Sequence, residues 1–391
     1  MNKIFKVNGH IHTPYSFSAF ENIEQAFQMA SSENIQVLGI NDFYVTDGYN
    51  EFSELAGKYH IYPLFNIELI SLLKDYQKAG VTINDPNNPG RTYISGKGLS
   101  FPFSLEENYR NSLNNIILES QKQVRKMVER TNLLLEEINA GFNLSFEDIK
   151  KKYARELVRE RHIAKALRIE LEKKFSDEAG LKKFLENLYS GKECNVSISN
   201  HAAYENEIRS NLFKAGGKAF VPETDNAFIE TKKAIDLIIM AGGIPTYPVL
   251  LDDINGNYTV FENDIVKLHE KLSNMGIYSV EFIPNRNSLD ALREYTLYFY
   301  HNNFLVTYGT EHNTPAMIPL TPTTRNSALD DDELLSIVSK STAVIAAHQH
   351  LKAKGIRGYL DGGGQADYKN LKDFIELGTY TIYNYIHSKT E

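Results

Sequence analysis

The alternation of apolar and polar positions near the start of the chain predicts strands separated by helices. Residues 3–7, 35–40 and 62–69 are predicted as strands, and the second run is mostly apolar, as in a parallel strand covered on both faces. Helical periodicity marks residues 21–32 and 51–59, which lie between these strands. The β-α-β-α order favours a parallel α/β architecture.

The alternation of strands and helices is interrupted once and then continues to about residue 308. Residues 84–102 have a loop-like composition, and the pattern from 105 to about 189 is helical and highly charged. From residue 215 the α/β rhythm resumes, with strands predicted over 244–251, 277–283 and 304–308 and helices over 228–240, 264–275 and 289–301. The aspartate triplet 330–332 predicts a helix start, because carboxylates favour helix N-termini.

Composition narrows the class of protein and its compartment. The chain has 391 residues, of which 42% are hydrophobic and 24% are charged, as in soluble globular proteins. Its one cysteine, Cys194, excludes an internal disulfide and a cysteine-cluster metal site. The N-terminus lacks the apolar core of a signal peptide, and no run of about 18 apolar residues could span a bilayer. We therefore expect a cytoplasmic protein with no membrane partner.

The charge of the chain is unevenly distributed. The formal net charge of −8 argues against non-specific binding of bulk nucleic acid. Residues 121–174 nevertheless carry 14 Lys and Arg against 9 Asp and Glu. This helical stretch either presents a basic surface to an anionic substrate or has a solvated surface with intrahelical ion pairs. The sequence leaves both interpretations open.

Several predicted strands end in residues with metal-binding chemistry. Side chains on a strand alternate between its faces, so His10 and His12 point to the same side. Glu68 ends the third predicted strand, and Glu311 follows the last one. If the sheet closes as a parallel barrel, the C-terminal ends of its strands share one rim. Two histidines and two carboxylates at that rim predict a mixed imidazole–carboxylate site for Zn, Mn or Fe.

Short motifs along the chain resemble those of the PHP (polymerase and histidinol phosphatase) family. The segments GHIHTPYS, LGINDFYVTDG and LFNIEL are similar to its His-x-His-Thr-x-x-Ser, Thr-Asp-His-Asp and Gly-Ile-Glu motifs. The segments RERHIAKAL, KAFVP, AGGIPTYP and VTYGTEHN resemble landmarks of the branch that contains nucleotide phosphatases and RNA 5′-exonucleases. The resemblance covers about residues 5–315. It implies a barrel that binds up to three metals and hydrolyses phosphoesters.

Some ligand positions of the family hold other residue types here. The positions of one family metal site are occupied by Phe17, Phe43 and Asn313. Two histidines of a second site correspond to Tyr93 and Tyr247. The resemblance leaves one site whose ligands are of the expected kind, namely His10, His12, Glu68 and Glu311. We therefore expect a reduced centre that binds one divalent metal or none.

The resemblance also supplies catalytic and substrate-binding candidates. The catalytic candidates are Asp42, Tyr247 and His312. Tyr247 could instead fill the volume of a lost ligand, and His312 could instead supply a nitrogen to the metal. The substrate-binding candidates are Arg161, His162, Tyr93 and Glu281. Arginine suits phosphate groups, whereas Glu281 could equally form a structural ion pair.

Together these features predict an α/β protein with a distorted (β/α)7 barrel and a helical insertion domain. Residues 1–102 and 215–328 are expected to form the barrel, 103–214 a mainly helical cap, and 329–391 a C-terminal helical extension. The predicted function is a metal-dependent phosphoesterase that acts on a phosphorylated small molecule, a nucleotide or a short oligonucleotide. The alternative is a catalytically degenerate PHP scaffold that binds a nucleotide, another phosphorylated ligand or a protein partner.

Overall fold

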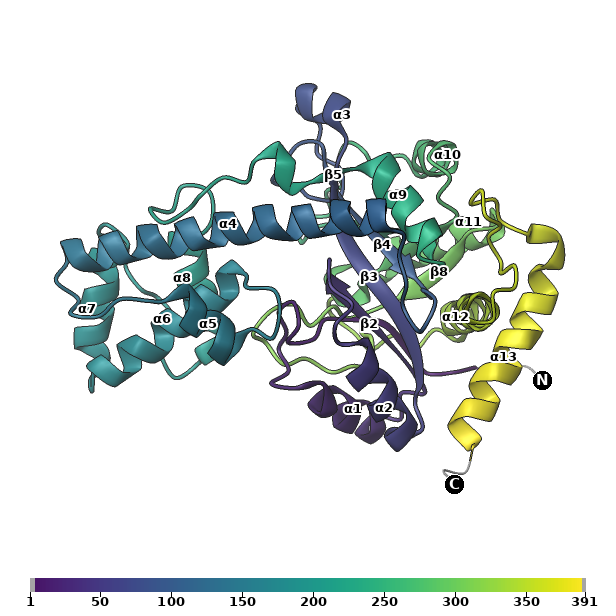
Figure 1. The fold of residues 1–391 in the computed structure, drawn as a ribbon, viewed down its shortest axis with the longest axis horizontal. Coiled ribbons are helices and arrows are strands. Elements are labelled where there is room, and N and C mark those ends of the chain that lie inside the picture. The colour runs from purple at the N-terminus through teal and green to yellow at the C-terminus, as the bar shows by residue number, and fades with distance from the viewer. Residues whose placement is uncertain (1–3, 389–391) are drawn as a thin grey trace.

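Seven strands form a sheet that curls into a nearly closed barrel (Figure 1). This computed structural model describes residues 4–388. In barrel order the strands are β1 (Val7–Ile11), β2 (Val37–Phe43), β3 (Tyr62–Leu72), β4 (Arg91–Lys97), β6 (Ile244–Val249), β7 (Ser279–Phe282) and β8 (Leu305–Tyr308), and the short β5 (Ile229–Glu230) pairs with β3. A parallel bridge between Ile11 and Glu311 joins β1 to the segment after β8. The predicted α/β barrel fold is confirmed.

Strand β4 runs antiparallel to its neighbours β3 and β6, whereas the other neighbouring pairs of the barrel are parallel. The predicted loop over 84–102 is therefore wrong for residues 91–97. The glycine-containing sequence conceals this strand, yet Gly96 suits it because a Cβ there would lie 2.9 Å from Ile238 Cγ2. The first strand is also displaced from its prediction, since it begins at Val7. Of the predicted range 3–7, Lys3 lies outside the described residues.

Helices lie around the barrel (Figure 1). They are α1 (Ile23–Ser32), α2 (Tyr49–Tyr59), α3 (Lys74–Lys78), α9 (Thr231–Met240), α10 (Ile265–Asn274), α11 (Leu289–His301), α12 (Asp332–Ala353) and α13 (Leu371–His387), with 3-10 turns η1 (Asp225–Ala227), η2 (Pro284–Arg286) and η3 (Tyr368–Asn370). The side chain of Asp331 accepts hydrogen bonds from the first turn of α12, which confirms the predicted helix start. Within residues 4–388, no helix combines the length and apolarity needed to cross a membrane.

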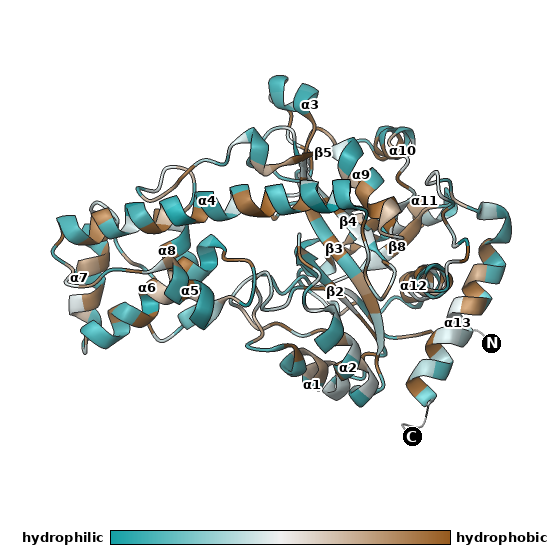
Figure 2. Cartoon of the chain, in the orientation of Figure 1, coloured by the Kyte–Doolittle hydropathy of each residue, from teal (hydrophilic) through white to brown (hydrophobic). Residues whose placement is uncertain are grey.

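A helical unit is inserted between β4 and β5 and extends from one side of the barrel (Figure 1). Its helices are α4 (Glu107–Glu137), α5 (Phe146–Tyr153), α6 (Glu160–Lys174), α7 (Glu178–Leu188) and α8 (His201–Leu212). Hydrophobic and hydrophilic bands alternate along α4 (Figure 2), because one side of this long helix packs against the others. The segment before α6 bonds to the barrel, where the Leu157 N–H donates to the carbonyl of Tyr15 at 2.9 Å.

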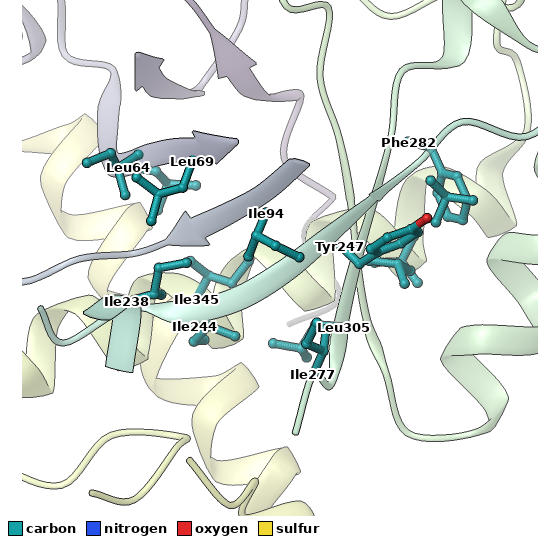
Figure 3. Packing of buried hydrophobic residues seen from close by; sticks show 14 of the residues in the cluster. Leu64, Leu69, Ile94, Ile238, Ile244, Tyr247, Ile277, Phe282, Leu305 and Ile345 are labelled. Atoms are coloured by element: carbon teal, nitrogen blue, oxygen red, sulfur yellow. The ribbon is translucent and has the colours of Figure 1, made fainter. Parts of the chain in front are cut away.

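The main hydrophobic core joins the barrel strands to α9 and α12. Figure 3 shows Tyr247 among the apolar side chains of this core, which include Ile244 and Phe282. Tyr247 is buried, and its hydroxyl donates to Glu262 Oε1 at 2.7 Å. Because the tyrosine fills core volume and its hydroxyl is bound to Glu262, it belongs to the packing of the barrel.

Candidate metal centre

His10, His12 and Glu68 bring three metal-binding atoms to one place at the rim of the barrel. Both histidines come from the end of β1, and Glu68 lies on β3 beside Phe43 of β2. The two Nε2 atoms lie 3.2 Å apart, and Glu68 Oε2 lies 3.3 Å from His12 Nε2 and 3.9 Å from His10 Nε2. Ligands about 2.1 Å from a tetrahedral zinc ion lie about 3.4 Å from one another. The spacing therefore fits three ligands of one ion.

Neighbouring groups hold both histidines with Nε2 facing this place. His10 donates from Nδ1 to Glu281 Oε2 at 2.8 Å. The side-chain Nδ2 of Asn41 donates to His10 Nε2 at 2.9 Å, so Asn41 has to turn away when Nε2 binds a cation. His12 Nδ1 lies 3.2 Å from the hydroxyl of Ser16. Hydrogen bonds at Nδ1 fix the tautomer in which the ring lone pair lies on Nε2, the atom that would bind a metal.

Asp42 lies on the Nδ1 side of His12 and is linked to that ring through Ser16. Its carboxylate accepts a hydrogen bond from the Ser16 hydroxyl at 2.5 Å and another from the Thr13 N–H at 2.7 Å. Because the Ser16 hydroxyl donates to Asp42, its oxygen is left to accept from His12 Nδ1. Asp42 was predicted as a catalytic residue, and the structure places it where it orients a histidine instead of in the cleft.

Burial acts in opposite directions on the metal-binding forms of His12 and Glu68. Burial lowers the pKa of His12 to about 4, so the imidazole is neutral at physiological pH. Burial raises the pKa of Glu68 to about 8, so its carboxyl group favours the protonated form at neutral pH, and a neighbouring cation would favour the ionised form. Two imidazoles and one carboxylate form a donor set that suits Zn, Mn or Fe. The residues present therefore fit a divalent metal.

Lys97 is a site residue that the sequence prediction missed. It lies on β4, is buried, and its Nζ is 2.6 Å from Glu281 Oε1. Although burial alone acts in the opposite direction, Lys97 and His10 hold the pKa of Glu281 at about 2. A Lys97–Glu281–His10 chain therefore supports His10, a candidate metal ligand, and Glu281 forms the structural ion pair that the sequence left open. The sequence prediction missed Lys97 because residues 84–102 were predicted as a loop.

Glu311, predicted as the fourth ligand, is held away from the other three. Its carboxylate forms a two-point ion pair with Arg286, and Nη1 of Arg286 lies 2.9 Å from Oε1. The group of metal-binding atoms found within residues 4–388 contains His10, His12 and Glu68 without Glu311. His312 is not free to replace it, because its Nε2 donates to the carbonyl of Ile318 at 2.9 Å and its Nδ1 lies 2.8 Å from Thr310 Oγ1.

A cleft of about 1080 Å³ lies between this rim and the helical unit. Glu68, Phe43 and Glu311 line its barrel side, and its basic lining residues are Arg91, Arg159, Arg161, Arg209, Lys214 and Arg286. Arg209 pairs with Glu160 at 2.8 Å, whereas Arg161 donates to the neutral amide of Asn206. Burial and the neighbouring Arg209 lower the pKa of Arg161 to about 10. Positive charge is therefore in excess where Arg159, Arg161, Arg209 and Lys214 surround Glu160. The rest of the lining is balanced by acidic residues, namely Glu68, Asp85, Glu223, Asp225 and Glu311.

The other predicted residues divide between the cleft and the packed interior. Tyr93 and Asn313 line the cleft with Phe43, whose ring lies 4.6 Å from that of His12. His162 is buried at the start of α6, where Nδ1 accepts a hydrogen bond from the Arg159 N–H at 2.9 Å. Phe17 packs its ring 4.9 Å from that of His162. His162 therefore stabilises the helix that presents Arg161.

No protein-family model matches the sequence, and no curated protein matches it. Solved structures do resemble its fold. A protein from Bifidobacterium adolescentis assigned as a metal-dependent phosphoesterase aligns with a TM-score of 0.56 and 17% identity over 85% of this chain and 94% of that chain. An amidohydrolase from Chromobacterium violaceum, solved with sulfate and without metal, aligns with a TM-score of 0.52 and 16% identity over 82% and 93% of the two chains. The chain thus shares the PHP-like barrel fold of these structures.

Proposed function

We propose that this protein is a metal-dependent phosphoesterase with one divalent cation bound by His10, His12 and Glu68. The observation that carries the proposal is the spacing of 3.2, 3.3 and 3.9 Å between their three ligand atoms. A bound cation would supply Lewis acidity and a nucleophilic hydroxide near neutral pH. The resemblance of the fold to that of the Bifidobacterium protein supports this function.

The basic residues that line the cleft favour the binding of an anionic substrate. Arg159, Arg161 and Arg209 lie near the single carboxylate of Glu160, so their charges are incompletely balanced. A guanidinium group binds a phosphate through two parallel hydrogen bonds. The ring of Phe43, under the guanidinium of Arg159, covers one side of the centre and limits access of water. These groups favour a phosphorylated small molecule, a nucleotide or a short oligonucleotide.

Metal content and hydrolysis test the proposal together. We expect the native protein, purified without added metal, to contain close to one equivalent of Zn, Mn or Fe and to hydrolyse members of a phosphoester panel. His12→Gln and Glu68→Gln remove a ligand and are expected to lose both properties, whereas His301→Gln, at the exposed end of α11, keeps both. A native protein that binds none of these metals would contradict the proposal.

A non-catalytic scaffold is the second candidate function. It is favoured by Phe43, which presents an apolar ring to the candidate centre and cannot hold a second cation. Under this hypothesis the cleft binds a phosphorylated ligand or a protein partner without turnover. Ligand binding that is unchanged by chelator and by Glu68→Gln, in a protein with no hydrolytic activity, would favour the scaffold.

A further inference from the structure

Glu311 is connected through its backbone to both metal-binding histidines. The carbonyl of Glu311 accepts a hydrogen bond from the His12 N–H at 2.7 Å, and the Glu311 N–H donates to the carbonyl of His10 at 2.9 Å. The side chain of Glu311 lines the same cleft as Glu68. Glu311 is thus placed beside the centre, although its carboxylate is not part of the group of three ligands.

An arginine holds the Glu311 carboxylate in its present position. Arg286, in η2 after β7, binds both carboxylate oxygens, and Asn313 Nδ2 donates to Oε2 at 2.9 Å. The Glu311 side chain is 11% exposed, whereas that of Arg286 is 44% exposed and reaches into the cleft. Glu311 and His312 both have positive φ, at 61° and 54°. Two consecutive non-glycine residues with positive φ have a strained backbone. Strain of this kind is found most often at ligand-binding sites and conformational switches.

We propose that Arg286 is an anion-responsive clamp that couples phosphate binding to metal binding. An anion bound by Arg286 releases Glu311, whose carboxylate then joins His10, His12 and Glu68 as a metal ligand. This proposal rests on the metal centre of the proposed function and adds a regulation of its ligand set.

The exchange of partners at Arg286 is favoured by charge and geometry. The Arg286 side chain is 44% exposed and lines the cleft, so an anion from solvent can reach the guanidinium that holds Glu311. A phosphate or sulfate dianion offers the same two-point geometry as the carboxylate and twice its charge. In its present position the Glu311 carboxylate already repels that of Glu68, and loss of the Arg286 pair would increase this repulsion. A cation shared by both carboxylates removes this repulsion.

Coupling of this kind is reciprocal, so either ligand can be the probe. Zinc affinity is measured by chelator competition with and without inorganic sulfate, at matched ionic strength set with chloride. In the native protein we expect sulfate to raise zinc affinity by about tenfold and zinc to raise sulfate affinity by the same factor. In Arg286→Gln we expect tight zinc binding without sulfate and no response to it, because Glu311 is already released.

Two further variants separate the clamp from simpler explanations. Sulfate that coordinates the metal directly would still couple in Glu311→Gln, whereas the clamp requires the coupling to disappear there. Arg293→Gln is the matched control, because Arg293 also pairs with carboxylates at 41% exposure and lies outside the cleft lining. Its coupling should equal that of the native protein. Zinc binding that ignores sulfate, or coupling that persists in Glu311→Gln, overturns the clamp alone. Absence of zinc binding under both conditions overturns the metal centre as well.

Discussion

Lys97 Nζ lies 2.6 Å from Glu281 Oε1 in the interior of the barrel, where both side chains are buried. The other oxygen of Glu281 accepts the hydrogen bond from His10 Nδ1. The pair therefore couples barrel stability to the orientation of His10, a candidate metal ligand. A buried charge left without its partner is costly, because neither water nor a counter-ion compensates it.

Lys97→Met is expected to lower the free energy of unfolding by about 3–5 kcal/mol, since it leaves the Glu281 carboxylate buried and unpaired. Urea unfolding of the metal-free protein measures this change. The double variant Lys97→Met/Glu281→Gln removes both charges and should recover much of the stability. A single variant as stable as the native protein would contradict the role of Lys97 in neutralising Glu281.

The local sequence pattern predicted a strand close to each candidate metal ligand, although the first strand begins at Val7, four residues later than predicted. A His-x-His pair at the end of a strand places both imidazoles on one side, and the apolar run before Glu68 marks a buried strand. Both features depend on neighbours in the chain. The three ligand atoms are found within 4.8 Å of one another.

The missed features depend on contacts between distant segments. Strand β4 contains glycine and lysine and is stabilised by its pairing with β3 and β6, so its own sequence resembles a loop. Lys97 lies 184 positions from Glu281, and Arg286 lies 25 positions from Glu311. Nothing in the local pattern around Glu311 indicates that an arginine holds its carboxylate. Glu311 was therefore predicted as a ligand only from its position at a strand end and from the resemblance of VTYGTEHN to the family motif.

Asp42→Asn is expected to weaken zinc binding by about 10–100-fold without removing a ligand. The Asp42 carboxylate accepts from Ser16, and the Ser16 oxygen in turn fixes Nδ1 of His12. Chelator competition measures the zinc affinity. Asp236→Asn, on α9, is the control and should bind zinc as the native protein does. An unchanged affinity in Asp42→Asn would show that Ser16 and Thr13 are sufficient to orient the histidine.

Arg161→Gln is expected to lower kcat/KM for a phosphoester substrate by about 10–100-fold, the effect of losing a hydrogen bond to a charged group. Arg161 faces the cleft and donates only to a neutral amide among the hydrogen bonds described for it. Metal content should be unchanged, because Arg161 contacts none of the three ligands. Arg125→Gln, an exposed change on α4, controls for the loss of one positive charge from the helical unit. Equal losses in the two variants would indicate a general electrostatic effect.

His348 gives the fold a dependence on pH that is separate from the metal centre. It is buried in α12, where Nε2 donates to the carbonyl of Gly242 at 2.9 Å and Nδ1 accepts from the Leu360 N–H. Burial lowers the pKa of His348 from 6.5 to about 3. Between these values the unfolded chain binds a proton that the folded protein excludes, so stability falls as pH falls through this window.

At pH 5 this one group should remove about 2 kcal/mol of the stability present at pH 8. His348→Gln keeps a donor for the Gly242 carbonyl but cannot titrate, so its loss of stability between pH 8 and pH 5 should be smaller by about that amount. Urea unfolding with chelator present measures the difference without a contribution from bound metal. His350→Gln, on the same helix, should reduce the pH dependence less than His348→Gln, because His350 is less buried and burial lowers its pKa only in part. If the native protein and His348→Gln lose the same stability between pH 8 and pH 5, a group other than His348 causes the pH dependence.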